Sequence, residues 1–60
     1  MFYRQYIGES VGESVTEAEA RDKLSRYYVD VNVVIETMRA GDTMYTPWAK
    51  FWYEDESIVK

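Results

Sequence analysis

The spacing of apolar and polar residues changes several times along this chain, and each change predicts a different element. Residues 2–15 contain β-branched residues and two glycines and show no helical period, which predicts an extended strand. In such a strand Glu9 and Glu13 share one face, about 13 Å apart at ~3.3 Å per residue. Neither face of this strand is fully apolar, so we expect it at the edge of a sheet or exposed.

A helix is predicted over residues 17–26. Thr16 and Glu19 have the spacing of a capping box, in which the threonine hydroxyl accepts a hydrogen bond from the Glu19 amide and the glutamate reaches back. Val15 and Ala20 occupy the two positions of a hydrophobic staple. The residues expected to form the buried stripe are Ala20, Leu24 and Tyr27 or Tyr28.

The second half of the chain is predicted to be β-rich. From Tyr27 to Met38 valines and an isoleucine alternate with mostly polar residues, which indicates a half-buried strand. Residues 39–42 are typical of a turn, and a short strand follows at 43–45. Pro47 then precedes a second alternating segment, Trp48 to Glu54.

The last residues predict a turn at Asp55-Glu56-Ser57 and a final short pairing at Ile58-Val59. The predicted fold is therefore α+β. It is a small antiparallel sheet of three to four strands with one helix packed on a face, in the order β-α-β-β.

Length limits this fold to one small domain, residues 1–60. A chain of this size has a thin core, and without cysteine it has no disulfide to stabilise it. Ten aromatic residues are the expected compensation, because each buries about 150–250 Å². Dimerisation is the other common remedy. No apolar signal segment or 18-residue apolar run is present, so we expect an intracellular, cytoplasmic protein.

The charge of the chain indicates a partner with a basic surface. The net charge is −4 and the pI is about 4.6, which argues against direct nucleic-acid binding. Residues 5–20 hold four glutamates and no basic residue. Stacking of nucleobases on Tyr45, Trp48, Trp52 and Tyr53 is one alternative, but without a basic groove core packing is the simpler role. A solubilising surface charge is the other interpretation of the acids.

Candidate catalytic groups are few. The chain has no histidine and no cysteine, which removes the usual general base and the thiol nucleophile. Ser10 and Ser14 have no neighbour in sequence that would activate them. No calcium-loop or phosphate-loop pattern occurs. We expect a protein that is not an enzyme and that has no metal and no cofactor.

Two segments resemble the phage-encoded family of uracil-DNA glycosylase inhibitors. The residues Tyr45-Thr46-Pro47-Trp48-Ala49 match a Tyr-x-Pro-Trp-Ala sequence that begins a late strand in that family, and an acidic turn follows at residues 54–56. The twice-repeated Glu-Ser-Val of residues 8–15, followed by a Glu-rich helix start, is similar to the family's first strand and short helix. The N-terminal helix of the family has no counterpart, and glycine stands where glutamine precedes Glu-Ser.

The resemblance implies a DNA mimic, whose carboxylates take the place of phosphates in the DNA-binding groove of uracil-DNA glycosylase. The residues expected to bind the partner are Glu9, Ser10, Val11, Glu13, Ser14 and Glu17. A hydrophobic pocket that captures an apolar side chain of the enzyme would be drawn from Val15, Leu24, Val31, Val33 and Met44, for which ordinary core packing is the alternative.

Two other functions remain open from the sequence. The first keeps the acidic surface but changes the target, to another DNA-acting or defence enzyme. The second is a small homodimeric structural domain that pairs through its edge strand or its aromatic surface. In that case the glutamates of the edge strand serve only to block aggregation.

Overall fold

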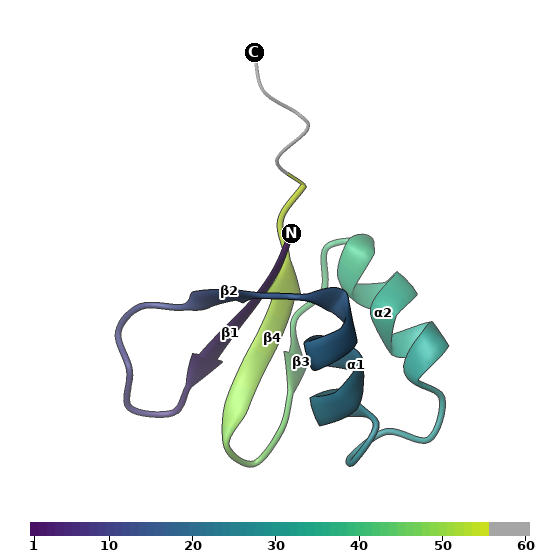
Figure 1. Ribbon diagram of the computed structural model, residues 1–60, viewed down its shortest axis with the longest axis horizontal. Coiled ribbons are helices and arrows are strands. Elements are labelled where there is room, and N and C mark those ends of the chain that lie inside the picture. The colour runs from purple at the N-terminus through teal and green to yellow at the C-terminus, as the bar shows by residue number, and fades with distance from the viewer. Residues whose placement is uncertain (56–60) are drawn as a thin grey trace.

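Four strands and two helices make up the part of the chain that the computed structural model describes, residues 1–55. The elements are β1 (Phe2–Tyr6), β2 (Glu13–Val15), α1 (Glu17–Leu24), α2 (Val31–Arg39), β3 (Met44–Tyr45) and β4 (Ala49–Tyr53). The strands form one antiparallel sheet in the order β2-β1-β4-β3, and both helices lie on the same side of it (Figure 1). The predicted α+β class with a small antiparallel sheet is confirmed, with β1 and β4 in its centre.

The predicted single strand over residues 2–15 is wrong, because the segment folds back on itself as a hairpin. Gly8 has a φ of 94°, a left-handed conformation that glycine adopts without steric cost, and the Glu9 amide donates to the Tyr6 carbonyl at 3.1 Å. Strands β1 and β2 then pair with Phe2 opposite Val15. The expectation of an edge strand holds for β2, which is an outer strand of the sheet.

The predicted strand between Tyr27 and Met38 is also wrong, because most of this segment belongs to the helix α2, which begins at Val31 and ends at Arg39. The Asp30 carboxylate accepts a hydrogen bond from the Val33 amide at 3.3 Å and caps the helix. Positions that are buried or packed against the core lie at the spacing i, i+3, i+4 and i+7, namely Val31, Val34, Ile35 and Met38. The apolar residues of this segment fit both the two-residue period of a strand and the period of a helix. The helix forms because its apolar stripe is buried against the core.

Helix α1 agrees with its prediction except at its end. Thr16 accepts from the Glu19 amide at 3.1 Å, as expected of a helix cap, and the helix ends at Leu24 with Ser25 as its C-cap. Ala20 and Leu24 are fully buried. The Glu19 carboxylate does not reach back to the cap but binds Arg4 of the sheet.

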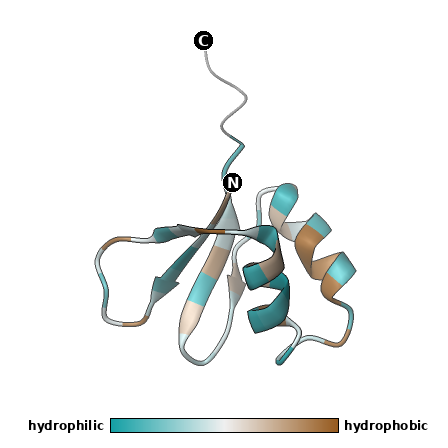
Figure 2. Ribbon diagram, viewed as in Figure 1, coloured by the Kyte–Doolittle hydropathy of each residue, from teal (hydrophilic) through white to brown (hydrophobic). Residues whose placement is uncertain are grey.

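One hydrophobic core lies between the helices and the inner face of the sheet. Its buried residues are Phe2, Ala20, Leu24, Val34, Ile35, Met38, Ala49 and Phe51. Figure 2 shows that α2 supplies a hydrophobic stretch while α1 is mostly hydrophilic. Because two helices pack on the sheet, the prediction of a single helix is corrected to two.

The outer face of the sheet has neither helix on it. Tyr3 lies opposite Trp52 in the β1–β4 pairing, and their rings stack with centroids 5.6 Å apart. Gln5 and Lys50 form the next pair on this face. An antiparallel sheet tolerates such a half-exposed arrangement because each strand alternates between its two faces.

Neither described helix is long and apolar enough to cross a membrane. The predicted turn at residues 55–57 and the predicted pairing at 58–59 extend outside the described residues.

Candidate protein-binding surface

The two Gly-Glu-Ser-Val copies have different structural roles. Gly8 forms the turn of the β1–β2 hairpin, and a Cβ built on it would meet no atom within 4 Å. Gly12 lies against the indole of Trp52, and a Cβ there would be 2.5 Å from the ring atom Cη2. The repeat in sequence is therefore not a repeat in structure.

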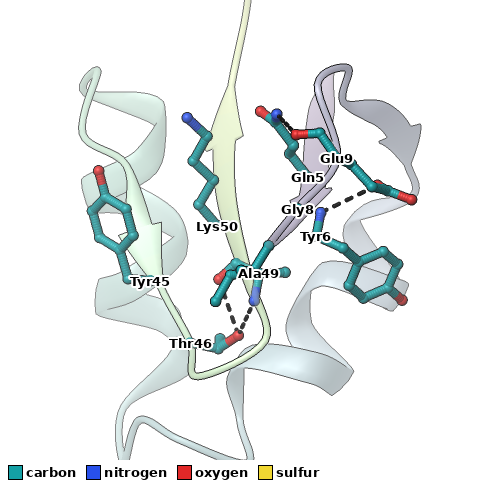
Figure 3. Close-up of a pocket in the computed structure, with 9 residues that line it drawn as sticks. Gln5, Tyr6, Gly8, Glu9, Tyr45, Thr46, Ala49 and Lys50 are labelled. Carbon is teal, nitrogen blue, oxygen red and sulfur yellow. Dashed lines mark hydrogen bonds between the residues drawn. The ribbon is translucent and has the colours of Figure 1, made fainter.

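The first copy places three of the predicted partner-binding residues in one exposed loop. Glu9, Ser10 and Val11 are exposed within residues 7–12, and Val11 leaves 72% of its surface exposed. The loop projects beyond the sheet on the side away from the helices (Figure 1). It is held by two hydrogen bonds between side chain and backbone: the Glu9 carbonyl accepts from the Gln5 side chain at 2.6 Å, and Glu9 Oε1 accepts from the Tyr6 amide at 3.3 Å (Figure 3).

The second copy places Glu13 and Ser14 on β2 instead. Glu13 faces Arg4, and its carboxylate is 2.7 Å from that guanidinium. The same guanidinium binds Glu19 at 2.7 Å, so that one arginine joins β1, β2 and α1. Glu9 and Glu13 therefore do not form the predicted row of carboxylates on one strand face.

Arg4 is the least exposed charged side chain of these pairs. Its side chain is 12% exposed, and its guanidinium also lies 4.6 Å from the centre of the Tyr6 ring. The Nε of Arg4 is buried without a hydrogen-bond partner in the described structure. Two carboxylates offset the cost of burying this cation.

Glu17 begins α1 and is also paired within the domain. It accepts hydrogen bonds from Arg21 at 2.9 Å and from Arg39 at 2.8 Å. The hydrogen bond from Arg21 is the main cause that lowers the pKa of Glu17, and the charge of Arg39 lowers it further against a desolvation effect that raises it. Of the three glutamates predicted to bind a partner, only Glu9 has no arginine partner in the described structure.

The residues predicted to line a hydrophobic pocket mostly belong to the core. Leu24 is fully buried, and Val15, Val31 and Met44 pack against the core cluster. Val33 is 57% exposed on the opposite side of α2. The structure thus places four of the five in the role of ordinary core packing and separates the fifth from them.

Sequence reasoning missed a surface at the end of the sheet where the two hairpin turns meet. The Ile7 amide donates to the Trp48 carbonyl at 2.9 Å and joins the β1–β2 loop to the β3–β4 turn. Around this junction the exposed apolar residues are Tyr6, Ile7, Tyr27, Tyr45 and Trp48. We call these five residues the aromatic end; Pro47 between two aromatic residues was the signal in the sequence that marked part of it.

Thr46 fixes the β3–β4 turn that presents Trp48. Its hydroxyl accepts from the Trp48 amide at 3.2 Å. It also accepts from the Ala49 amide at 3.0 Å and donates to the Ala49 carbonyl at 3.0 Å (Figure 3). The Thr46 amide also donates to the Ala49 carbonyl at 2.8 Å, so the turn is ordered by the side chain and the backbone of one residue. Trp48 remains 68% exposed at its tip.

The aromatic end has a cavity on each face of the sheet. The outer cavity, about 210 Å³, is the one drawn in Figure 3, where Gln5, Tyr45 and Lys50 surround it. The inner cavity, about 180 Å³, lies between the sheet and the end of α1. Tyr6, Thr46 and Ala49 line both.

Among residues 1–55 no group of three or more acidic side chains is placed to hold a metal ion. In three comparisons, no protein-family model, no curated protein and no solved structure matches the chain. The surface is therefore interpreted from its own geometry.

Proposed function

We propose that this chain is a non-catalytic protein-binding domain that uses the acidic loop 7–12 together with the aromatic end. The observation that carries the proposal is that a backbone hydrogen bond joins exposed Ile7 to exposed Trp48, and that the exposed Glu9 lines the outer cavity together with Ile7. Exposed aromatic residues grouped on one surface are typical of protein interfaces, where tryptophan and tyrosine contribute much of the binding energy. Ser10 and Ser14 have neither histidine nor cysteine in the chain to activate them, which supports a binding role over a catalytic one.

The partner we propose is uracil-DNA glycosylase, which this domain would inhibit by occupying its basic DNA-binding groove. The net charge of −4 and the resemblance at Tyr45-Thr46-Pro47-Trp48-Ala49 support this choice. Glu9, Ser10 and Val11 would enter the groove first. Glu13, Ser14 and Glu17 would follow along β2 and the start of α1.

Internal pairing changes how these later residues act. Glu13 and Glu17 already bind arginines of this domain, so contact with the enzyme requires that an arginine or lysine of the enzyme share or replace Arg4 and Arg21. The Glu9 carboxylate accepts a hydrogen bond from the Tyr6 amide but has no arginine partner among the described residues, so it needs no such exchange. We therefore assign Glu9 the largest electrostatic share, and we assign the apolar contact to Trp48 and Ile7 instead of to the core residues predicted earlier.

A uracil-excision assay tests this function directly. Purified protein is titrated against a bacterial uracil-DNA glycosylase on uracil-containing DNA, and activity should fall to zero at a stoichiometric ratio. The variant Glu9→Gln with Trp48→Ala should weaken inhibition by at least about 100-fold, which is about 2.7 kcal/mol. Glu36→Gln removes the same charge from the exposed face of α2 and should inhibit like the parent. Full glycosylase activity at a large molar excess would exclude this target.

The same acidic surface suits another DNA-acting or defence enzyme, and a panel of nucleases assayed in the same way would identify it. A homodimer is the second candidate, because β2 is an edge strand and the outer face with its Tyr3–Trp52 stack has no helix on it. Sedimentation at micromolar concentration separates the two. A tight dimer with β2 and the Trp52 indole shielded from solvent would favour the structural role.

A further inference from the structure

The inner cavity combines positive charge with aromatic walls, although the chain as a whole is acidic. Its cationic residues are Arg4, Lys23 and Arg26, and its aromatic residues are Tyr6, Tyr27, Trp48 and Phe51. No carboxylate lines it among the described residues. We propose that this cavity binds a small aromatic carboxylate, with the ring between the aromatic side chains and the carboxylate at Lys23 and Arg26. This site goes beyond the proposed function, because it requires neither the acidic loop nor a partner enzyme.

Two of the three cations are available to a ligand. Arg4 is committed to Glu13 and Glu19 at 2.7 Å each. Arg26 has only a long contact of 3.7 Å with Asp22, and both of those side chains are 64% exposed. Lys23 forms no ion pair with the carboxylates of residues 1–55. A ligand carboxylate would thus meet two cations that need not give up a buried partner.

The backbone carbonyls at the C-terminal end of α1 do not compete with a ligand for Lys23 and Arg26. The carbonyls of residues 21–24, which a helix C-terminus leaves without intrahelical partners, all accept hydrogen bonds here. Ser25 supplies two of the donors, through its amide to Arg21 and its hydroxyl to Asp22. Lys23 and Arg26 therefore remain free to face the cavity.

The volume selects the size of the ligand. At about 180 Å³ the cavity is smaller than the ~300–1,000 Å³ typical of sites for drug-sized ligands. A cavity of about 150 Å³ in another protein holds one benzene molecule. One six-membered ring therefore fills most of this cavity, and an acidic group attached to it reaches the rim.

The experiment uses benzoate as the probe, followed by two-dimensional NMR of the whole chain. Benzoate should bind with a dissociation constant of about 1 mM and shift the indole N–H resonance of Trp48. Trp52 is an internal control, because it lies on the outer face of the sheet. Benzamide lacks the charge and acetate lacks the ring, so each should bind about ten-fold more weakly or not measurably.

Two variants test whether the charges of Lys23 and Arg26, and not a general change in the fold, determine benzoate binding. Lys23→Gln with Arg26→Gln should reduce benzoate affinity about ten-fold and leave the weak binding of benzamide unchanged. Lys50→Gln removes an exposed lysine from the other face and should have no effect. Equal binding of benzoate and benzamide, or shifts that follow Trp52 instead of Trp48, would overturn the proposal.

The source of the carboxylate is decided by a second pair of probes. A short peptide that ends in phenylalanine is compared with benzoate and with the same peptide carrying a C-terminal amide. Tighter binding of the free-acid peptide assigns the site to the end of a protein chain. Tighter binding of benzoate assigns it to a free aromatic acid.

Discussion

Gly12 and Trp52 are in such close contact that no larger residue fits at position 12. A Cβ on Gly12 would lie 2.5 Å from Cη2 of the indole and 3.3 Å from the Arg4 carbonyl. The indole cannot simply swing away, because it stacks on Tyr3 and its Nε1 donates to Glu54 at 2.9 Å. Position 12 therefore couples the β1–β2 loop to β4.

The variant Gly12→Ala should lower the free energy of unfolding by about 1–3 kcal/mol, since the added methyl group displaces Trp52 or the backbone. Urea denaturation followed by circular dichroism measures the change. Ser10→Ala, in the same loop but exposed, should stay within about 0.5 kcal/mol of the parent. Trp52→Leu should lower the free energy of unfolding less in the Gly12→Ala variant than in the parent. Additive losses from the two substitutions would mean that residues 12 and 52 are not coupled.

Arg4→Lys should destabilise the domain although it keeps the charge. One guanidinium reaches both Glu13 and Glu19, and the point charge of lysine cannot reproduce that fork. Because the glutamates are 66% and 41% exposed, solvent screens the loss, and we expect only about 1 kcal/mol. In a double-mutant cycle with Glu19→Gln the coupling should be measurable, and a coupling of zero would mean that the pair contributes nothing.

The pKa of Glu17 should respond to its two arginines in a definite order. The folded-state pKa lies below the ordinary value of 4.5, so this group favours the folded state above 4.5 and that contribution is lost as the pH falls through the folded pKa. A carboxylate NMR titration should show that Arg21→Gln raises the pKa of Glu17 more than Arg39→Gln does, because the Arg21 hydrogen bond is the largest cause. The opposite order would assign the main effect to Arg39.

Valines 33 and 34 distinguish the helix α2 from the strand that alternation predicts. Val34 is 5% exposed and Val33 is 57% exposed, whereas a strand would bury Val33 together with Val31 and Ile35. Val34→Ala should cost about 2 kcal/mol through lost burial. Val33→Ala should be neutral or stabilise the domain by up to ~0.5 kcal/mol, because alanine favours a helix. Thermal denaturation of both variants measures these changes in stability. A larger loss for Val33→Ala than for Val34→Ala would favour the predicted strand over the helix.

Prediction from sequence was most accurate where a local interaction controls the structure. Thr16 and Glu19 specify the start of α1 through one side-chain to backbone hydrogen bond, which needs no distant residue. The turn after Arg39 was also expected, and Gly41 takes up its positive φ of 114° there. The Asp30 cap was a local signal too, but the alternation of the valines after it concealed the helix.

The candidate site was less predictable from the sequence, because its charged and aromatic side chains contact residues that lie far away along the chain. Glu13 and Glu19 find Arg4, 9 and 15 residues away, and Glu17 finds Arg39 at a separation of 22. Two of the three segments of the aromatic end, the β1–β2 loop and the β3–β4 turn, meet because β1 and β4 pair in the centre of the sheet, which places Ile7 beside Trp48.

The sequence by itself determined an acidic, cysteine-free α+β domain, the first helix, and the residue types available for binding. Capping, turns and net charge are properties of neighbouring residues or of the whole composition, so they can be derived without coordinates. Only the tertiary structure decided that α2 is a helix and that the Gly-Glu-Ser-Val copies divide between a loop and a strand. It also decided which of the three glutamates predicted to bind a partner, Glu9, has no arginine partner within residues 1–55. Those outcomes depend on which apolar stripe is buried against the sheet and on which distant cation each carboxylate meets, and folding fixes both through non-local contacts.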